Sequence, residues 1–414
     1  MSLANFETTV ALTLLNANAV RERAHRMLAM GLDDKLANFR VDLERIDGVI
    51  ELVLETTRKA YPSFEVPFHS RWRHFVVSGD DRWAAIAQQR EWRDRDSRAR
   101  AEFDLAIVSV FLDAGAGPAW RYHDVKTGLA IGRSEGLGLA SLAMFASGAF
   151  SADSRDPLRV DADVLANFSV ADLMRGLQVC KTNPLVGLEG RADLLRRLGA
   201  LVSSKRDVFG RLDKPRPGGL FDSLASFAKD APLPAPTILS ELLQQIGPIW
   251  PSRLNLGGIA LGDCWKHPAL TTHDATSGLM PLHKLSQWLA YSLIEPLQTA
   301  GLAVCDIDGL TGLAEYRNGG LFIDSGVLAF RNMEEARREH EVGSPLVVEW
   351  RALTVALLDR VAQGMRQRLG LDTTSLPLAK VLQGGTWAAG RSLARQRRAD
   401  ASPPIKVISD GTVF

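Results

Sequence analysis

The chain has 414 residues, 46% hydrophobic and 23% charged, a composition typical of a globular protein with an extensive core. Lys and Arg number 49 against 48 Asp and Glu, so the strong positive charge of a duplex-binding protein is absent and we expect no nucleic-acid partner. Cys180, Cys264 and Cys305 form neither a CxxC pair nor a disulfide framework, which indicates a reducing compartment, the cytoplasm. No apolar run reaches the roughly 18 residues of a membrane helix, so no membrane association is expected.

Helical periodicity dominates the chain. Apolar residues three and four positions apart predict helices over residues 5–28, 43–59, 100–112 and 137–145, and later around Trp288 and over 345–369. The predicted fold class is therefore mainly α, with a few short strands. Residues 214–236 contain five prolines and an adjacent glycine pair, which predicts a connection between an N-terminal helical lobe, 1–213, and a C-terminal one, 237–414, that carries most site motifs.

The segment 304–320, VCDIDGLTGLAEYRNGG, holds an unusual density of polar groups and four glycines. Asp308 is predicted to be the N-cap of a short helix that Gly319 and Gly320 terminate. Glu315 would then lie near the end of that helix, where a negative charge is unfavourable, so it is either solvated or has a specific task. We expect the helices around Trp288 and over 345–369 to pack on both sides of this segment.

Two further places suit an anionic ligand. His283 and Lys284 open a helix, whose free amides and a mobile ammonium group can bind an anion, although a solvated first turn would look the same. The turn at 384–386, Gly-Gly-Thr, is a second candidate cradle but lacks the spacing of a nucleoside triphosphate loop. Trp387, beside it, can stack on a flat ligand or belong to the core.

The stretch 132–138, GRSEGLG, has the spacing GxxxGxG, and no preceding strand is evident, so a tight loop into the next helix is the simpler interpretation. Ser134 and Glu135 in that loop can still face a ligand. The eight histidines show neither HxxxH nor HExxH spacing, so we predict no metal and no cofactor.

Seven motifs distributed along the chain carry a resemblance to a known family. They are RWRHF at 71–75, RSEGLGLAS at 133–141, NPLVGLEGR at 183–191, HKLSQW at 283–288, the segment 304–320, VEWRALT at 348–354 and QGGTWAAGR at 383–391. Together they closely resemble the uracil-catabolism family of fungi and bacteria, over nearly the whole chain. That family belongs to a route in which a cyclohydrolase-like enzyme opens the ring of uridine monophosphate, leaving a ribosylurea phosphate that must give urea and ribose 5-phosphate.

A second resemblance suggests a reaction. LTGLAEYR at 310–317 is similar to the Leu-Thr-x-Phe-Ala-Asp-Tyr-Arg region of queuosine-salvage N-glycosidases, helical proteins with a fold similar to DNA glycosylases. HKLSQ at 283–287 and VEWRA at 348–352 are similar, in the same chain order, to their Tyr-Lys-Arg-Ala-Gln and Glu-Ile-Arg-Gly stretches. The family's carboxylate falls on Glu315, which is longer by one methylene, a displacement that matters where placement governs rate.

The two resemblances together imply an N-ribosyl hydrolase that cleaves ribosylurea 5-phosphate, or a close ureido-ribosyl compound, to urea and ribose 5-phosphate. Glu315 would stabilise the oxocarbenium-like charge or activate water, Asp306 or Asp308 would be the second carboxyl group, and Arg317 would orient the carboxylate. Lys284, Arg71 and Arg73 are candidate contacts to the phosphate of the substrate. The full set of candidate substrate contacts is Arg317, Tyr316, His283, Lys284, Arg71, Arg73, His74, Ser134, Glu135, Glu349, Arg351 and Trp387.

Two alternatives from other classes remain. The chain could be a non-catalytic partner or regulator of the ring-opening enzyme, with which it would then associate. It could also be a nucleic-acid glycosylase, but its near-zero net charge argues against that, since binding a phosphate backbone needs a basic surface.

Overall fold

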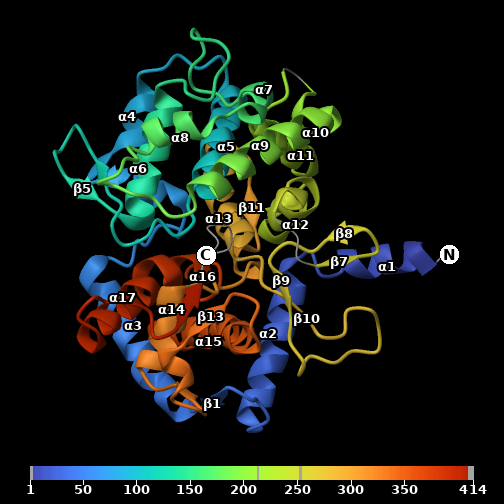
Figure 1. The fold of residues 1–414 in the computed structure, drawn as a ribbon, viewed down its shortest axis with the longest axis vertical. Coiled ribbons are helices and arrows are strands. Elements are labelled where there is room, and N and C mark those ends of the chain that lie inside the picture. The colour runs from blue at the N-terminus through green and yellow to red at the C-terminus, as the bar shows by residue number, and fades with distance from the viewer. Residues whose placement is uncertain (1–2, 212–213, 251–253, 409–414) are drawn as a thin grey trace. The chain divides into compact units, whose positions relative to one another are not determined.

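The structure is a computed structural model that describes residues 3–211, 214–250 and 254–408 (Figure 1). The fold is mainly α, as predicted, and the strands of the described residues are short and join only in pairs. No described helix is both long and apolar enough to span a lipid bilayer. The chain forms two compact units, each built from separate segments: unit 1 contains 3–69, 254–287 and 306–408, and unit 2 contains 70–250 and 288–305.

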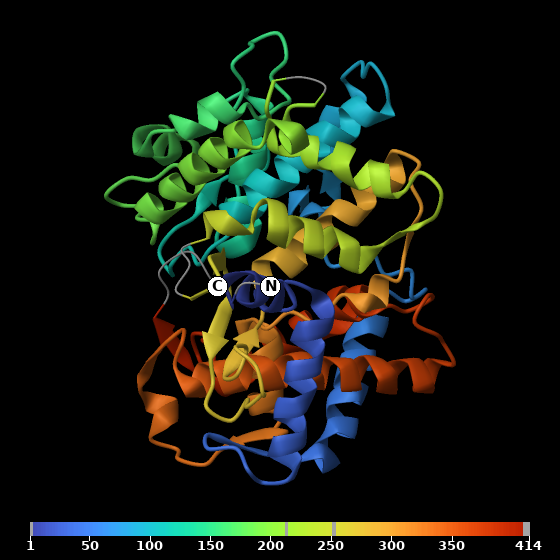
Figure 2. The same ribbon diagram turned by 90° about the vertical axis from the view of Figure 1, so that its right-hand side faces the viewer.

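Unit 1 is organised around the long helix α15 (Pro345–Leu369), whose Trp350 is almost completely buried. Helices α2 and α3 pack against α15, and Figure 2 shows these blue helices crossing the orange-red α15. The helices of this unit are α1 (Leu3–Leu12), α2 (Ala17–Leu32), α3 (Ile46–Ala60), α14 (Tyr316–Asp324), α15 (Pro345–Leu369), α16 (Leu378–Val381) and α17 (Trp387–Arg397). The boundary with unit 2 falls inside α13 (Lys284–Thr299), whose first turn belongs to unit 1.

Four strand pairs complete unit 1. Antiparallel pairs join β1 (Phe39–Val41) to β12 (Leu328–Phe330), β9 (Cys264–Lys266) to β10 (Leu279–Pro281) and β7 (Asn255–Leu256) to β8 (Ile259–Ala260), and a parallel pair joins β13 (Glu339–Glu341) to β14 (Lys406–Ile408). The β1–β12 pair links parts of the sequence almost 300 residues apart, with Phe39 opposite Phe330. Unit 1 is therefore held together by contacts between distant segments.

Unit 2 is organised around α5 (Arg95–Phe111), which is contacted by α6 (Arg133–Ala146), α9 (Leu188–Ser204) and α11 (Leu220–Phe227). Its helices are α4 (Arg82–Gln88), α5 (Arg95–Phe111), α6 (Arg133–Ala146), α7 (Ala162–Ala166), α8 (Val170–Gly176), α9 (Leu188–Ser204), α10 (Arg206–Phe209), α11 (Leu220–Phe227) and α12 (Ala235–Gln245). Its strand pairs are β2 (Val76–Val77) with β3 (Asp80–Asp81), β4 (Tyr122–His123) with β5 (Ala130–Ile131), and the parallel pair β6 (Leu233–Pro234) with β11 (Val304–Cys305). The short strand β5 directly precedes α6, a strand that the sequence pattern at 132–138 did not indicate.

The predicted connection at 214–236 does not coincide with the boundary between the units. Its described residues lie inside unit 2, where Pro217–Gly219 form a 3₁₀ turn against α5 and β6 pairs with β11. The turn comes so close to α5 that a β-carbon on Gly218 would lie 2.2 Å from the carbonyl oxygen of Arg100. Proline and glycine here permit close packing within a unit.

The predicted helices agree with the structure to different degrees. The helix predicted over 345–369 is α15 with the same ends: the Ser344 side chain accepts the Val347 amide, and Gly370 ends the helix with φ +64°. The helix predicted over 5–28 is two helices, because the chain breaks after α1 and the Asn16 side chain accepts the Ala19 amide, at 2.9 Å, to begin α2.

Candidate active site

Glu315 is the N-cap of α14, so the prediction that it lies near the end of a helix is wrong. Its carboxylate accepts the amides of Arg317, at 2.7 Å, and Asn318, at 2.6 Å, and its backbone carbonyl accepts the amide of Gly319. Gly319 and Gly320 lie within the helix and do not terminate it. The helix amides therefore favour the negative charge of Glu315.

The ionisation of Glu315 reflects opposing influences. Burial raises the pKa of its carboxyl group, and this effect exceeds the lowering by the two backbone hydrogen bonds and by the positive charge of Lys284. A carboxyl group with a raised pKa exchanges protons closer to neutral pH than a solvated one. Glu315 is therefore equipped to act as a general base or acid.

The two aspartates of the same segment have other positions. Asp308 lies in the 3₁₀ turn Ile307–Gly309, but its carboxylate accepts the amide of Leu378, at 2.6 Å, and pairs with Arg366 at 3.2 Å. Asp308 thus caps the first turn of α16, 70 residues away. Our prediction that it caps the helix that follows it in sequence is wrong. Asp306 is exposed, with φ +48° and no capping hydrogen bond. Neither aspartate has a position that identifies it as a second catalytic carboxyl group.

Both of the helices predicted to pack against segment 304–320 contact it within unit 1. The Gln287 side chain, in the first turn of α13, donates to the Thr311 hydroxyl at 2.7 Å and accepts the Thr311 amide. From α15, Arg351 donates to the carbonyl of Ala314, at 3.3 Å. The segment that carries Glu315 is therefore fixed by both helices.

Asp263 organises the beginning of α13. Its carboxylate accepts the Lys284 amide at 2.9 Å, and its backbone carbonyl accepts the amides of Leu282 and His283. His283 has φ +47°, and its buried Nε2 lies 3.0 Å from the carbonyl of Leu14. The amides of His283 and Lys284 and the Nε2 atom of His283 are thus occupied, whereas the buried Nδ1 of His283 has no hydrogen-bond partner within the described part of the chain. The Lys284 side chain retains partial exposure.

A buried ion pair joins Asp263 to Arg351. Two parallel hydrogen bonds of 2.8 Å connect the guanidinium to both carboxylate oxygens, and the indole of Trp265 adds a third donor at 2.7 Å. Although burial acts to raise it, the pKa of Asp263 lies well below its usual value because Arg351 and these donors stabilise the charged form. Asp263 is thus a permanently ionised anchor that positions Arg351 and Lys284.

Sequence reasoning missed Asp263. The residue lies 88 positions before Arg351, in a turn between two strands too short to be evident from periodicity. Nothing local distinguishes it from a solvated aspartate.

Tyr316 and Arg317 follow Glu315 at the start of α14. Burial raises the pKa of the Tyr316 phenol, which also senses the charges of Arg351 and Glu315, so the phenol remains protonated at neutral pH. Arg317 donates from its guanidinium to the carbonyl of Ala401, at 2.8 Å. Glu315, Tyr316, Lys284, Arg351 and Asp263 form one cluster in unit 1, which we call the Glu315 cluster.

Other predicted residues of unit 1 are committed to packing. The fully buried carboxylate of Glu349 accepts the backbone amides of Asn38 and Phe39 at 3.1 and 2.8 Å, which anchors β1 to α15. The predicted cradle at 384–386 is buried in a π-helical turn, where a β-carbon on Gly385 would lie 2.5 Å from the carbonyl of Val53. That close approach to α3 explains the glycine, and the prediction of an anion cradle is wrong. Trp387 is half-buried, with the guanidinium of Arg391 over its ring.

The predicted residues of unit 2 form a cluster of their own. Arg71 is completely buried and pairs with Asp113 at 2.9 Å, while its Nε donates to the Ser109 hydroxyl at 2.6 Å. The His74 ring lies 3.0 Å from the Arg71 guanidinium, and the Ser134 hydroxyl donates to Asp113 at 2.7 Å.

Glu135 and Arg73 lie at the margins of this cluster. The negative charge of Glu135 acts to raise the pKa of Arg71. Burial has the larger effect, and the pKa of Arg71 is lowered. Arg73 pairs with Glu295 at 2.6 Å. Arg71, His74, Ser134 and Glu135 are thus brought together, whereas Arg73 has a separate partner.

Among the described residues, no group of three or more His, Cys, Asp or Glu side chains converges in a way that could hold a metal ion. The Glu315 cluster instead combines one carboxylate of raised pKa with fixed positive charges. Such an arrangement can stabilise or transfer charge on a polar, anionic substrate.

The fold and this cluster define a mainly helical protein with a partly buried carboxylate at a helix N-terminus. The chain belongs to the family described as "Protein of unknown function (DUF1688)", which matches residues 13–414. It is 38% identical to "Protein urg3" of Schizosaccharomyces pombe, over 98% of this chain and all of the relative. It is 34% identical to "Uracil catabolism protein 4" of Lachancea kluyveri, over 91% of this chain and 92% of that protein. The resemblance to the uracil-catabolism family is thereby confirmed.

Proposed function

We propose that this protein acts in uracil catabolism as an N-ribosyl hydrolase, cleaving the N-glycosidic bond of ribosylurea 5-phosphate, or of a close ureido-ribosyl compound, to urea and ribose 5-phosphate. The pathway is supported by the relative named "Uracil catabolism protein 4". The observation that carries the reaction is the carboxylate of Glu315, held by two helix amides and raised in pKa by burial.

The proposed chemistry assigns the reacting protons to two side chains. As the bond from C1′ to the urea nitrogen breaks, positive charge develops on the ribosyl ring, and ionised Glu315 stabilises it. Glu315 then takes a proton from the water whose oxygen bonds to C1′. Lys284, whose charge already acts on Glu315, donates a proton to the departing nitrogen and recovers it from Glu315.

Positioning in this proposal falls to the remaining members of the cluster. Asp263 fixes the Lys284 backbone and the Arg351 guanidinium, and Arg351 in turn holds the carbonyl of Ala314, next to Glu315. Preorganised groups of this kind require little rearrangement during the reaction. The protonated Tyr316 phenol is a candidate donor to the substrate.

The test is to incubate the purified protein with ribosylurea 5-phosphate and to measure urea and ribose 5-phosphate. The Glu315→Gln variant should lose activity by roughly 10²- to 10⁴-fold, the range for removal of an acid–base group. Glu334→Gln is the matched control, because Glu334 is 63% exposed and lies outside the cluster, and its activity should be unchanged.

Two outcomes would contradict the proposal at different levels. Full activity of Glu315→Gln would exclude the assigned site but not the reaction. Absence of urea release by the unaltered protein, combined with stimulation of the ring-opening enzyme, would replace the hydrolase with the regulator.

A further inference from the structure

A polar cavity lies entirely within unit 2, beside the N-terminal half of α5. Its volume is about 440 Å³, within the range that small-molecule sites occupy. Seven basic and three acidic side chains line it, so the lining carries an excess of positive charge. Its arginines are Arg90, Arg93, Arg100, Arg159, Arg211 and Arg216.

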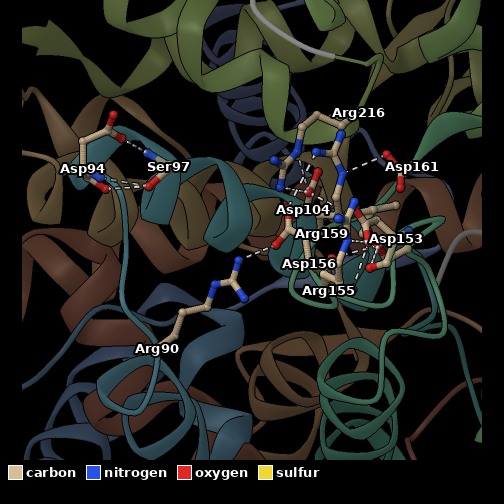
Figure 3. A network of polar contacts seen from close by, with 12 residues as sticks. Arg90, Asp94, Ser97, Asp104, Asp153, Arg155, Asp156, Arg159, Asp161 and Arg216 are labelled. Atoms are coloured by element: carbon tan, nitrogen blue, oxygen red, sulfur yellow. Dashed lines mark hydrogen bonds and ion pairs between the residues drawn. The ribbon is translucent and has the colours of Figure 1, made fainter.

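Carboxylates orient the two most buried of these arginines. Arg216 donates from Nε to Asp104 at 2.9 Å, and Asp104, completely buried, also accepts the amide of Val160. Arg159 donates from Nε to Asp161 at 2.8 Å. Figure 3 shows Arg159 and Arg216 together, beside Asp104 and Asp161. Their guanidinium groups are therefore fixed in direction before any ligand arrives, which reduces the entropy cost of binding an anion.

The two aspartates that line the cavity, Asp156 and Asp222, do not occupy all of its hydrogen-bond donors. Asp222 is engaged by Arg100 at 2.7 Å and Asp156 by Arg90. The Nε atom of Arg90 is buried and has no hydrogen-bond partner within the described part of the chain. Arg211, which is exposed, has no ion-pair partner among the described residues. Donors suited to an anionic ligand thus remain at the cavity.

One wall of the cavity is apolar. Trp92 is half-buried and lines the cavity together with Leu158, and the Arg90 guanidinium lies 5.4 Å from the centre of its ring. An indole offers a flat surface on which a ring of a ligand can stack. A purely inorganic anion would leave this wall unused.

We propose that this cavity is a binding site for a small phosphate ester, with the phosphate against the arginines and the organic part against Trp92 and Leu158. Arginine forks match the geometry of phosphate oxygens, and several guanidinium groups around one volume suit a dianion. The site lies in unit 2 and uses none of the residues of the Glu315 cluster. It is therefore independent of the proposed hydrolytic step.

The experiment measures binding to the full chain by calorimetry, with uridine and adenosine 5′-monophosphates as probes. The corresponding nucleosides, inorganic phosphate and succinate are compared in parallel. The variant with Arg93→Gln and Arg211→Gln, which we call the lining variant, removes two exposed positive charges from the lining of the cavity, so folding should be preserved. The variant with Arg337→Gln and Arg338→Gln makes the same charge change at two exposed arginines of unit 1, which are 77% and 66% exposed.

We expect the monophosphates to bind at least about tenfold more tightly than the nucleosides. The lining variant should bind the monophosphates about tenfold more weakly than the unaltered protein, which is the effect of losing one charged contact. The Arg337/Arg338 variant should bind like the unaltered protein. Loss of binding in Lys284→Ala with retention in the lining variant would assign the ligand to the Glu315 cluster and overturn the proposal. Absence of phosphate-dependent binding, equal loss in both double variants, or equal affinity for succinate would overturn it as well.

Discussion

Glu315 is a carboxylate on which burial and stabilising contacts act in opposite directions. Burial raises its pKa in the folded protein, whereas the amides of α14 and the charge of Lys284 lower it, and burial dominates. In the unfolded chain the pKa returns to an ordinary value, about 4.3. The folded state therefore binds the Glu315 proton more tightly than the unfolded state does.

This difference predicts how stability depends on pH. Between the unfolded and the folded pKa, the folded state holds more protons, so the contribution of Glu315 to the free energy of unfolding falls as pH rises through that window. Glu315→Gln removes this contribution. The stability of the unaltered protein minus that of Glu315→Gln should thus increase as pH is lowered from 7 towards 5, in urea unfolding at each pH. A difference that decreases on acidification would show that the charged form is the one favoured by folding.

At the scale of elements, helix α14 packs against the buried Trp350 of α15 at a position that requires glycine, Gly319. A β-carbon on Gly319 would lie 2.6 Å from the indole of the buried Trp350, whereas one on Gly320, the next residue, would meet nothing nearer than Pro404 at 3.2 Å. Gly319 therefore allows α14 to approach α15 closely, while Gly320 has more space.

The two glycines form a matched pair of substitutions. Gly319→Ala should lower the free energy of unfolding by about 1–3 kcal/mol, because the added methyl overpacks the contact with Trp350. Gly320→Ala should be close to neutral or stabilising by up to about 1 kcal/mol, since alanine is the better helix former. Urea unfolding of both variants measures the difference. If both variants were destabilised equally, backbone flexibility at the two positions, and not the contact with Trp350, would explain why glycine is needed there.

The same elements show what the sequence could and could not predict. Helix α15 was predicted from its apolar periodicity, and its two ends coincide with Ser344 and Gly370, which are local signals of a helix start and stop. Helix α14 was misplaced because its N-cap is a glutamate, which is not among the usual capping residues, and because a glycine pair normally ends a helix.

The candidate site was only partly predictable for a related reason. Glu315 and Lys284 lie in motifs that resemblance could identify, and within unit 1 the charge of Lys284 acts on Glu315. The anchor Asp263 and the cap that Asp308 provides to α16 depend on partners 88 and 70 residues away. Contacts of that separation arise from tertiary packing and leave no periodic trace.

At the scale of the whole molecule, the chain alternates between the units. Unit 1 needs residues from three separate segments, since β1 pairs with β12 and Glu349 of α15 holds the amides of Asn38 and Phe39. Unit 2 likewise needs the strand β11, which pairs with β6 across some 70 residues. Neither unit corresponds to a continuous half of the sequence.

This interleaving predicts the behaviour of fragments cut after residue 213. The fragment 1–213 lacks β12 and α15, and the fragment 214–414 lacks α2, α3 and α5, so each exposes apolar surface that its own residues cannot cover. Neither fragment should unfold cooperatively or show near-ultraviolet circular dichroism. When the two are expressed together they should reassociate and recover both, because the cut itself removes no contact. A cooperative transition in either isolated fragment would mean that half of the chain contains a complete core, which the pairing of β1 with β12 argues against.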